Sequence, residues 1–389
     1  MGRLGECGVA SNRLHRFYWR LLHLPVELFM KLKFGYKYKK PKTKELPGTY
    51  IVLSNHVTDY DPIFVGMSFR KQMYFVASEH ITRWGLASKL LKHCFAPIIR
   101  YKGTTAASTV MEMVRKVKDG KSVCMFAEGA RSWDGVTAYI QPATGKVIKS
   151  AKCALITYRI EGGYFVSPVW SEGGTRKGRV SGNIVNIYTA EQIAEMSVAQ
   201  INEVIAKDLH VDAYERQLAE PARYKGKHLA VRLESMLFVC PKCGAIDSLF
   251  SEKDTVQCTK CDMIFRYNEY AMLEGIEHKT VKDLYARQKD EVKKMASADN
   301  FSFSSANGVL KNVTKGEEIV LAQGPVSLSK EKFICGDYEI SFGDILDMAM
   351  HGRYALVFST RTGYYELVSE QNVLKYHLLY EFYKTGTLR

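Results

Sequence analysis

Four cysteines in the second half of the chain constrain its fold more strongly than any other feature. They form two Cys-x2-Cys pairs, Cys240 with Cys243 and Cys258 with Cys261. Four thiolates at this spacing are typical of a closed, tetrahedral zinc site. Such a site leaves no position open for a substrate or a water molecule, so we expect a structural zinc. The metal would fold a zinc ribbon over residues 237–270, which is too small for a hydrophobic core of its own. Four buried free cysteines are the alternative, but these rarely occur as two matched pairs.

The positive charge of the chain is concentrated at its start. The formal net charge is +14, and residues 1–45 carry 11 Lys and Arg against three acidic residues. Nucleic acid and anionic membranes both attract such a block. The nine cysteines are an odd number, which argues for a reducing compartment rather than a disulfide framework. The sequence has neither a signal-peptide pattern nor a run of about 18 apolar residues, so we expect peripheral binding at the cytoplasmic face of a membrane.

Residues 13–34 have the pattern of an interfacial helix. Apolar residues such as Leu14, Phe17, Leu21 and Leu28 recur at helical spacing, cations lie between them, and Pro25 would kink or split the helix. A helix packed on its own domain would have the same pattern. The polybasic run at 37–44 decides between them, because each cation near anionic lipid contributes about 1 kcal/mol. We therefore predict that residues 13–44 bind an anionic membrane surface and that nucleic acid is not a partner.

Two apolar runs are each followed by polar residues that could act on a substrate. The run at 50–54 leads to His56, with Asp61 five positions later. A histidine oriented by a carboxylate is the minimum needed for general-base catalysis. The run at 122–126 leads to Glu128, Gly129 and Arg131. Glycine allows the backbone to approach a ligand, and a guanidinium binds two phosphate oxygens at once.

The order of these motifs resembles the glycerolipid acyltransferase family, whose best-known members are the 1-acylglycerol-3-phosphate (lysophosphatidate) O-acyltransferases. The resemblance rests on His-x4-Asp, on the Ile-Ile-Arg that ends at Arg100, and on Phe-x-Glu-Gly-x-Arg-Ser, and it covers residues 50–214. It implies transfer of an acyl chain from acyl-CoA or acyl carrier protein to the free hydroxyl of lysophosphatidate or a related lysophospholipid.

The resemblance also implies roles for individual residues. His56 would be the general base and Asp61 its orienting partner, whereas the spacing of Asp59 does not match the family. Phosphate binding would fall to residues of the second and third motifs and one neighbour: Arg131, Arg100, Lys102, Glu128 and Gly129. Among these, Glu128 would orient Arg131 or a backbone amide, and Gly129 would keep its loop close to the ligand.

Some positions depart from the family pattern. Ala127 replaces a proline and Ala130 a threonine, and residues 154–163 replace an apolar motif that contains a proline. Arg159 and Glu161 in that segment could meet a larger headgroup, so a different lysolipid or a glycolipid remains an alternative acceptor. A catalytically decayed, zinc-ribbon nucleic-acid-binding protein is a further alternative. The few cations of the ribbon are offset by acids, which counts against it.

The sequence predicts an α/β acyltransferase domain, a mixed sheet flanked by helices, over residues 46–220. Strands are predicted at 50–54, 73–77, 95–99, 121–126, 153–160, 164–170 and 180–189, and helices at 62–70, 81–92, 105–118 and 190–208. A basic linker at 221–236 precedes the ribbon, and a helical connector at 271–299 follows it. Residues 300–389 alternate like short antiparallel strands and end in a helix, which resembles a pleckstrin-homology or GRAM domain in topology. Together with the basic segment at 1–45, these are the predicted domains.

Overall fold

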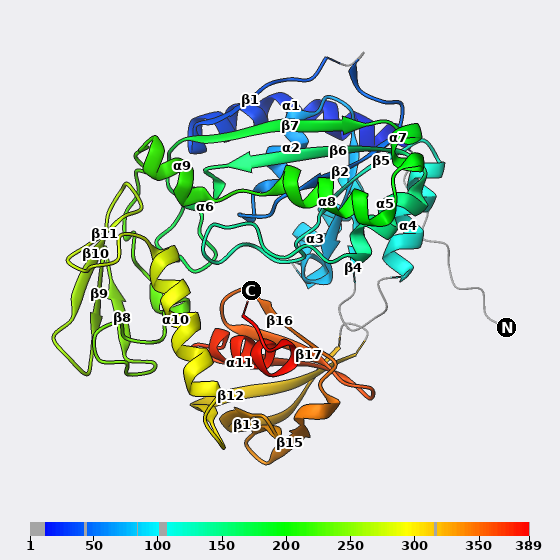
Figure 1. Ribbon diagram of the computed structural model, residues 1–389. Coiled ribbons are helices and arrows are strands. Elements are labelled where there is room, and N and C mark those ends of the chain that lie inside the picture. The colour runs from blue at the N-terminus through cyan, green and yellow to red at the C-terminus, as the bar shows by residue number, and fades with distance from the viewer. Residues whose placement is uncertain (1–11, 43–44, 84, 101–106, 315–316, 389) are drawn as a thin grey trace. The chain divides into compact units, whose positions relative to one another are not determined.

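The structure, a computed structural model, describes residues 12–42, 45–83, 85–100, 107–314 and 317–388. The chain divides into two compact units (Figure 1). The first consists of Met1–Gly129, Ile140–Glu161 and Val180–Val211, and the second of Ala130–Tyr139, Gly162–Arg179 and Asp212–Arg389. Neither unit is one continuous segment, because two short stretches interrupt the first unit. The domain boundaries given above remain a prediction.

The first unit is built on a mixed sheet of seven strands in the order β1-β7-β6-β2-β5-β3-β4. The strands are β1 Tyr36–Tyr38, β2 Tyr50–Ser54, β3 Met73–Ser78, β4 Ile98–Arg100, β5 Ser122–Phe126, β6 Ala154–Glu161 and β7 Val180–Tyr188. β2 lies in the middle, parallel to both β5 and β6, and all five of its residues are buried. Only β6 and β7 pair in the antiparallel sense among these strands. A mixed sheet flanked by helices is the fold that the sequence predicts.

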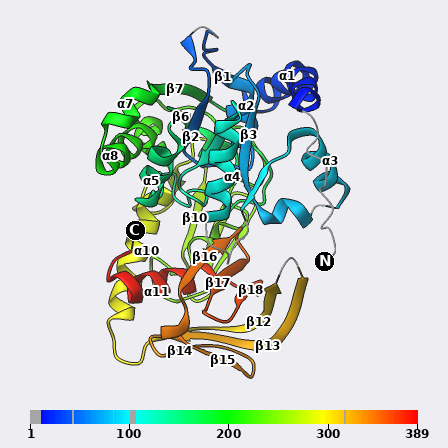
Figure 2. The ribbon, with the colours of Figure 1, turned by 90° about the vertical axis from the view of Figure 1, so that its right-hand side faces the viewer.

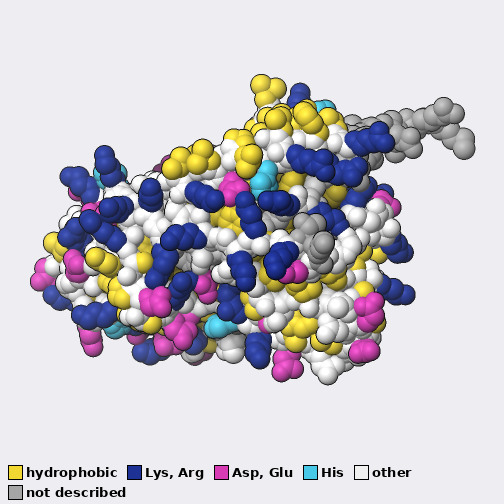
Figure 3. Space-filling model, turned by 90° about the horizontal axis from the view of Figure 1, so that it is seen from above, with side chains coloured by type: hydrophobic (Ala, Val, Ile, Leu, Met, Phe, Trp, Pro, Cys, Tyr) yellow, Lys and Arg dark blue, Asp and Glu magenta, His cyan; other side chains and the backbone are white. Residues whose placement is uncertain are grey.

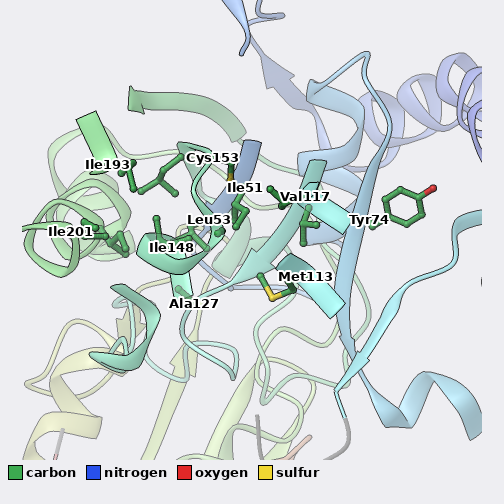
Figure 4. Close-up of a cluster of buried hydrophobic side chains, with 14 of the residues drawn as sticks. Ile51, Leu53, Tyr74, Met113, Val117, Ala127, Ile148, Cys153, Ile193 and Ile201 are labelled. Carbon is green, nitrogen blue, oxygen red and sulfur yellow. The ribbon is translucent and has the colours of Figure 1, made fainter. Parts of the chain in front are cut away.

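Helices cover both faces of this sheet. They are α1 Asn12–Phe34, α2 Asp61–Ser68, α3 Leu86–Phe95, α4 Ala107–Lys118, α5 Ala143–Ala151, α7 Ala190–Glu195 and α8 Val198–Leu209, with a 3-10 turn at Glu79–Arg83. Successive strand residues point to opposite faces. Ile51 and Leu53 of β2 therefore meet α5 and α8 on one face, where Ile148 and Ile201 join the core (Figure 4). Figure 2 shows α7 and α8 on one side of the sheet and α1 on the other.

The second unit contains the cysteine pairs and a larger antiparallel sheet. A four-stranded sheet, in the order β11-β10-β9-β8, comprises β8 Leu249–Glu252, β9 Thr255–Cys258, β10 Ile264–Tyr267 and β11 Leu273–Glu274. Helices α6 Gly163–Val166 and α9 Ala213–Ala219, the 3-10 turn Leu233–Ser235 and helix α10 Val281–Ala296 complete this part. Gln288 of α10 is buried and joins the helix to the ribbon. Its amide donates a hydrogen bond to the carbonyl of Met236 and accepts the backbone N–H groups of Phe238 and Val239.

The C-terminal sheet has seven antiparallel strands in the order β15-β14-β13-β12-β18-β17-β16. They are β12 Ser302–Thr314, β13 Glu317–Ser329, β14 Lys332–Cys335, β15 Tyr338–Ser341, β16 Asp347–His351, β17 Ala355–Ser359 and β18 Tyr364–Val368, followed by α11 Leu374–Thr385. A 3-10 turn at Phe342–Asp344 separates β15 from β16. The predicted β-rich domain with a C-terminal helix is confirmed, and its likeness to a pleckstrin-homology or GRAM domain remains a topological resemblance.

Four predicted elements differ in the structure. The strand predicted at 95–99 is β4 Ile98–Arg100, because helix α3 extends to Phe95. The strand predicted at 164–170 is wrong: a short helix, α6, begins after Gly162 (φ 74°), and periodicity alone cannot tell a buried apolar strand from a buried helix. The helix predicted at 190–208 is two helices, because Ser197 and Gln200 form a second capping box that starts α8. The helix predicted at 81–92 begins only at Leu86.

Candidate active site

His56 and Asp61 lie together in the loop between β2 and α2. Nδ1 of His56 is 2.8 Å from Oδ2 of Asp61, whose side chain is fully buried while that of His56 is 22% exposed. An ionised carboxylate only accepts hydrogen bonds, so Nδ1 carries the hydrogen and Nε2 keeps its lone pair. The same carboxylate oxygen accepts the backbone N–H groups of Val57 (2.6 Å) and Thr58 (2.9 Å). The loop is therefore wrapped around Asp61, which also lies in the first turn of α2, where the helix dipole favours a negative charge.

The loop after β5 supports His56 from a second direction. β2 and β5 are parallel neighbours with Ser54 opposite Phe126, so both strands end at the same edge of the sheet. The imidazole of His56 stacks on the ring of Phe126, with centroids 4.6 Å apart and planes inclined by 24°. Oε1 of Glu128 accepts the backbone N–H of His56 at 2.6 Å. Of the two roles that the sequence suggested for Glu128, this contact corresponds to orienting a backbone amide.

Arg100 reaches the same loop from the far edge of the sheet. It ends β4 and is exposed. Gly129 has φ 74°, and a β-carbon placed on it would lie 3.9 Å from Nη1 of Arg100. The structure therefore brings His56, Asp61, Glu128, Gly129 and Arg100 together within the first unit.

The remaining residues from the sequence motifs are placed differently. Arg131 is half-buried and belongs to the second unit, whose position relative to the first is not defined. Lys102 lies outside the described residues. Asp59 is exposed.

Asn55 supports the site, and the sequence analysis missed it. Its fully buried side chain donates to the carbonyl of Ile160 (2.9 Å) and accepts the N–H of the same residue (2.8 Å). The amide acts as an extra peptide group and extends the β2–β6 pairing beyond its last pair, Ser54 and Tyr158. The chain can then turn away at His56 without leaving the backbone groups of Ile160 unpaired. An amide residue one position after the apolar run at 50–53 was the available signal.

Arg159 does not contribute to a headgroup site in the way that the sequence suggested. Its Nε and Nη2 donate to the carbonyl of Asp208 at 2.9 and 2.6 Å, and Nη2 reaches that of Lys207 at 3.3 Å. These carbonyls belong to the last turn of α8, where a cation is favourable. The guanidinium therefore caps a helix. Glu161, at the end of β6, is half-buried.

A thiol lies in the strand next to the histidine loop. Cys124 in β5 is fully buried, and burial together with the negative charge of Asp61 raises the pKa of its thiol well above the usual value. A buried, protonated thiol is a poor nucleophile. Cys124 is therefore not a candidate nucleophile.

The four cysteines of the ribbon have the geometry of a metal site. All four Sγ atoms lie within 4.8 Å of one another, and Cys240–Cys261 and Cys243–Cys258 are each 3.8 Å apart. Four sulfurs at the usual zinc distance of about 2.3 Å stand about 3.8 Å apart along each tetrahedral edge. The backbone N–H groups of Cys243 and Lys260 point at Sγ of Cys240 and Cys258. These residues therefore fit a tetrahedral metal ion.

Comparison with known proteins finds a family for the part of the chain that contains these residues. A family model described as Acyltransferase matches residues 37–170. A solved structure, the 1-acyl-sn-glycerophosphate (LPA) acyltransferase PlsC from Thermotoga maritima, is 15% identical over 55% of this chain and 85% of that chain, with a TM-score of 0.44. No curated protein matches the chain. The family match covers His56, Asp61, Arg100, Glu128, Gly129 and Arg131, and on this basis the protein carries an acyltransferase domain.

Proposed function

We propose that the protein transfers an acyl chain from a thioester, acyl-CoA or acyl carrier protein, to the free hydroxyl of lysophosphatidate or a related lysophospholipid. The hydrogen bond between His56 Nδ1 and Asp61 Oδ2 carries this proposal, because it leaves Nε2 as a partly exposed base. The alignment of that loop with the Glu128–Gly129 turn at one sheet edge supports it further. The family match supplies the reaction class.

The reaction needs two proton transfers, one to His56 and one from it. Nε2 of His56 accepts the proton of the acceptor hydroxyl as its oxygen attacks the thioester carbonyl. Asp61 stabilises the imidazolium that forms. Collapse of the tetrahedral intermediate breaks the carbon–sulfur bond, and the imidazolium returns the proton to the leaving thiolate. General-base catalysis of this kind contributes about 10²- to 10⁴-fold.

Arg100 is the cation that the described site offers to the acceptor's phosphate. It lies beside Gly129, where the backbone carries no side chain between the guanidinium and an incoming ligand. Arg131 remains a predicted phosphate ligand on the strength of its motif, and so does Lys102. Because Arg159 caps α8, the argument for a larger, polar headgroup loses one of its two residues. We therefore favour lysophosphatidate over a glycolipid as the acceptor.

Helix α1 supports binding to an anionic membrane surface. It has two apolar faces. One is buried and includes Trp19, Met30 and Phe34. The other is exposed by 56–72% and forms a stripe: Phe17, Leu21, Leu24, Leu28 and Leu32. Packing on the domain therefore buries one apolar stripe and leaves the second exposed, which is the pattern of an interfacial helix.

Cations surround the exposed stripe of α1. In Figure 3, apolar side chains gather along the upper edge of the face, with lysine and arginine side chains beside them. The acid of α1, Glu27, is buried and bonded to Lys31 (2.6 Å) and Lys40 (3.1 Å), so it fixes the start of the polybasic run against the helix. Among the described residues, no helix is long and apolar enough to cross a bilayer. We propose a peripheral enzyme that binds the cytoplasmic face of a membrane through residues 13–44.

The metal of the ribbon would be a structural zinc held by four cysteines. A sulfur-filled tetrahedron stabilises the fold and takes no part in the proton transfers at His56. The ribbon contacts the C-terminal helix: Lys375, fully buried, forms an ion pair with Asp247. Zinc would therefore hold together the second unit.

The proposal is tested by acyl transfer in the presence of phospholipid vesicles. Purified protein, a labelled acyl-CoA or acyl carrier protein, and lysophosphatidate should yield phosphatidate. Asp61→Asn should lower kcat by about 10²- to 10⁴-fold, whereas Asp59→Asn, a matched change on the exposed neighbour, should leave it unchanged. Equal activity of the two variants would contradict the assignment. Product from a different lysolipid alone would correct the acceptor and keep the reaction.

A further inference from the structure

We infer that α3 is a second membrane-binding helix, which enters the same lipid surface as α1 and delivers bilayer substrate to the side of the site that bears Arg100. This inference rests on the proposed function of a membrane-bound acyltransferase. It concerns a helix for which the sequence analysis predicted no partner.

Two leucines of α3 are exposed to an unusual degree. Leu86 is 82% exposed, more than any other large apolar side chain in the described part of the chain, and Leu90 is 64% exposed. They are four residues apart and so lie on one face of the helix. Of the ten residues in α3, only Ser88 and Cys94 are buried. The helix thus turns Leu86 and Leu90 outward, while Leu91 and Phe95 are half-buried.

The charges of α3 complement an anionic lipid surface. Lys89 and Lys92 are exposed and flank the two leucines, and residues 86–95 contain no acidic residue. Apolar side chains between lysines that can reach headgroups are the composition of a helix lying in the interface. A helix without acidic residues does not attract a basic partner. A second copy of this chain would be such a partner, because the chain as a whole is basic.

α3 continues the proposed membrane face of α1. The rings of Tyr18 in α1 and His93 in α3 meet edge to face, with centroids 5.8 Å apart. Figure 2 shows the two helices next to each other along one side of the first unit. α1 comes from the start of the chain and α3 from the middle of the domain, yet both expose leucines with lysine or arginine beside them. Two helices give a firmer hold than one, because their apolar burial adds.

The helix is also joined directly to the candidate site. α3 ends at Phe95, Ala96 adopts a left-handed conformation (φ 42°), and β4 begins at Ile98. β4 ends at Arg100, beside Gly129. A membrane-bound α3 would therefore hold the proposed phosphate-binding arginine close to the headgroup layer, where a lysophospholipid presents its phosphate.

The test compares two double variants of the full-length protein. Leu86→Glu/Leu90→Glu changes α3, and Leu218→Glu/Leu346→Glu changes two leucines of the second unit that are 58% and 56% exposed. Binding is measured by flotation with vesicles of phosphatidylcholine and phosphatidylglycerol. We expect the α3 variant to lose about tenfold or more in vesicle partitioning, since each buried leucine contributes about 1.5–3 kcal/mol, and the control to bind like wild type.

Further readouts separate this inference from the proposed function. With a water-soluble, short-chain acceptor and no vesicles, the α3 variant should keep wild-type activity. If every protein is inactive with every acceptor, the proposed function fails while the flotation result still decides the role of α3. In a Leu90→Trp variant, tryptophan emission should shift to the blue on adding vesicles. Wild-type vesicle binding by the α3 variant, or a dimer in solution that the variant dissociates without a change in partitioning, would overturn the inference.

Discussion

One oxygen of Asp61 bonds His56 Nδ1 at 2.8 Å while also accepting two backbone N–H groups of the loop between them. The carboxylate therefore does two tasks: it selects the imidazole tautomer and it shapes the turn that presents the ring. The five-residue spacing in the sequence is the length of chain needed to fold back onto that oxygen. Asp59 lies in the same loop, but its side chain is exposed and does not take the place of Asp61 beside His56.

Asn55 should affect catalysis through the backbone of the neighbouring residue. Asn55→Asp removes the donor to the Ile160 carbonyl and places a buried charge there, which should cost about 1–3 kcal/mol or more and lower kcat by displacing His56. Urea unfolding and steady-state kinetics measure the two effects. Asn183→Asp, at an exposed position of β7, is the control and should leave both kcat and unfolding unchanged. An Asn55→Asp variant with wild-type kcat would show that the bridge to Ile160 does not position His56.

Glu27 should make the attachment of α1 sensitive to acid. Burial alone would raise the pKa of this carboxyl, but hydrogen bonds from Lys31 and Lys40 outweigh it and lower the pKa to about 2. Because the folded pKa lies below the unfolded value, the stabilisation is complete above the unfolded pKa and is lost as the pH falls from about 4.3 towards 2. Glu27→Gln should cost about 1–3 kcal/mol at neutral pH.

The measurement for Glu27 is urea unfolding across this pH range, with hydrogen exchange of α1 as a local probe. The difference between wild type and Glu27→Gln should shrink as the pH drops below the unfolded pKa. Glu45→Gln is the control, since the pair that Glu45 forms with Lys42 at 3.4 Å is exposed. A difference between wild type and Glu27→Gln that stays constant down to about pH 2 would show that the carboxylate is not what holds the helix.

The ribbon should depend on its metal and should stabilise the C-terminal helix through one ion pair. Asp247→Asn leaves the buried ammonium of Lys375 without a counter-charge, which should cost about 3–5 kcal/mol. Asp262→Asn breaks an exposed pair with Lys242 and should cost less than about 1 kcal/mol. Thermal unfolding compares the two variants.

The ribbon should also depend on its metal. Elemental analysis should find one zinc per chain, and a strong chelator should increase hydrogen exchange in β8–β10 before β2 and β5. Full stability without metal would contradict the structural zinc.

Gly182 should tolerate no side chain. A β-carbon there would lie 2.1 Å from the hydroxyl of Tyr158 and 2.2 Å from that of Tyr36, which are hydrogen-bonded to each other at 2.8 Å. Gly182→Ala should therefore force β1, β6 and β7 apart and destabilise the first unit by about 1–3 kcal/mol. Gly48→Ala, which meets nothing within 4 Å, is the control. Equal melting temperatures for the two variants would show that the sheet edge can relax around the extra methyl group.

Local patterns in the sequence were enough to place the central strands and the chemistry at their ends. Tyr50–Ser54 and Ser122–Phe126 are short buried runs bounded by polar residues, and the structure has strands at both. What could not be predicted depends on contacts between distant residues. The bridge from Asn55 to Ile160 spans 105 positions, and the stacking of His56 on Phe126 requires two strands to be neighbours. The interruption of the first unit by residues 130–139 and 162–179 has no local signature either.

Arg159 and the segment at 164–170 also show what residue type alone cannot predict. The sequence suggests a headgroup contact for Arg159 because residues 154–163 depart from the family's apolar motif, yet its partners are carbonyls of α8, 48 and 49 positions away. Tyr164 and Phe165 were interpreted as strand residues because they are apolar, and they are indeed buried. Burial was predictable from residue type, whereas the backbone conformation was set by Gly162 just before them.

The most direct test of this account is acyl transfer to lysophosphatidate on vesicles by wild type and His56→Ala. With a labelled acyl-CoA or acyl carrier protein as donor, wild type should form phosphatidate. The His56→Ala variant, with an unchanged melting temperature, should be slower by about three orders of magnitude, within the range for the loss of a general base. Transfer at the wild-type rate by the folded variant would contradict the role of His56 and with it the central claim.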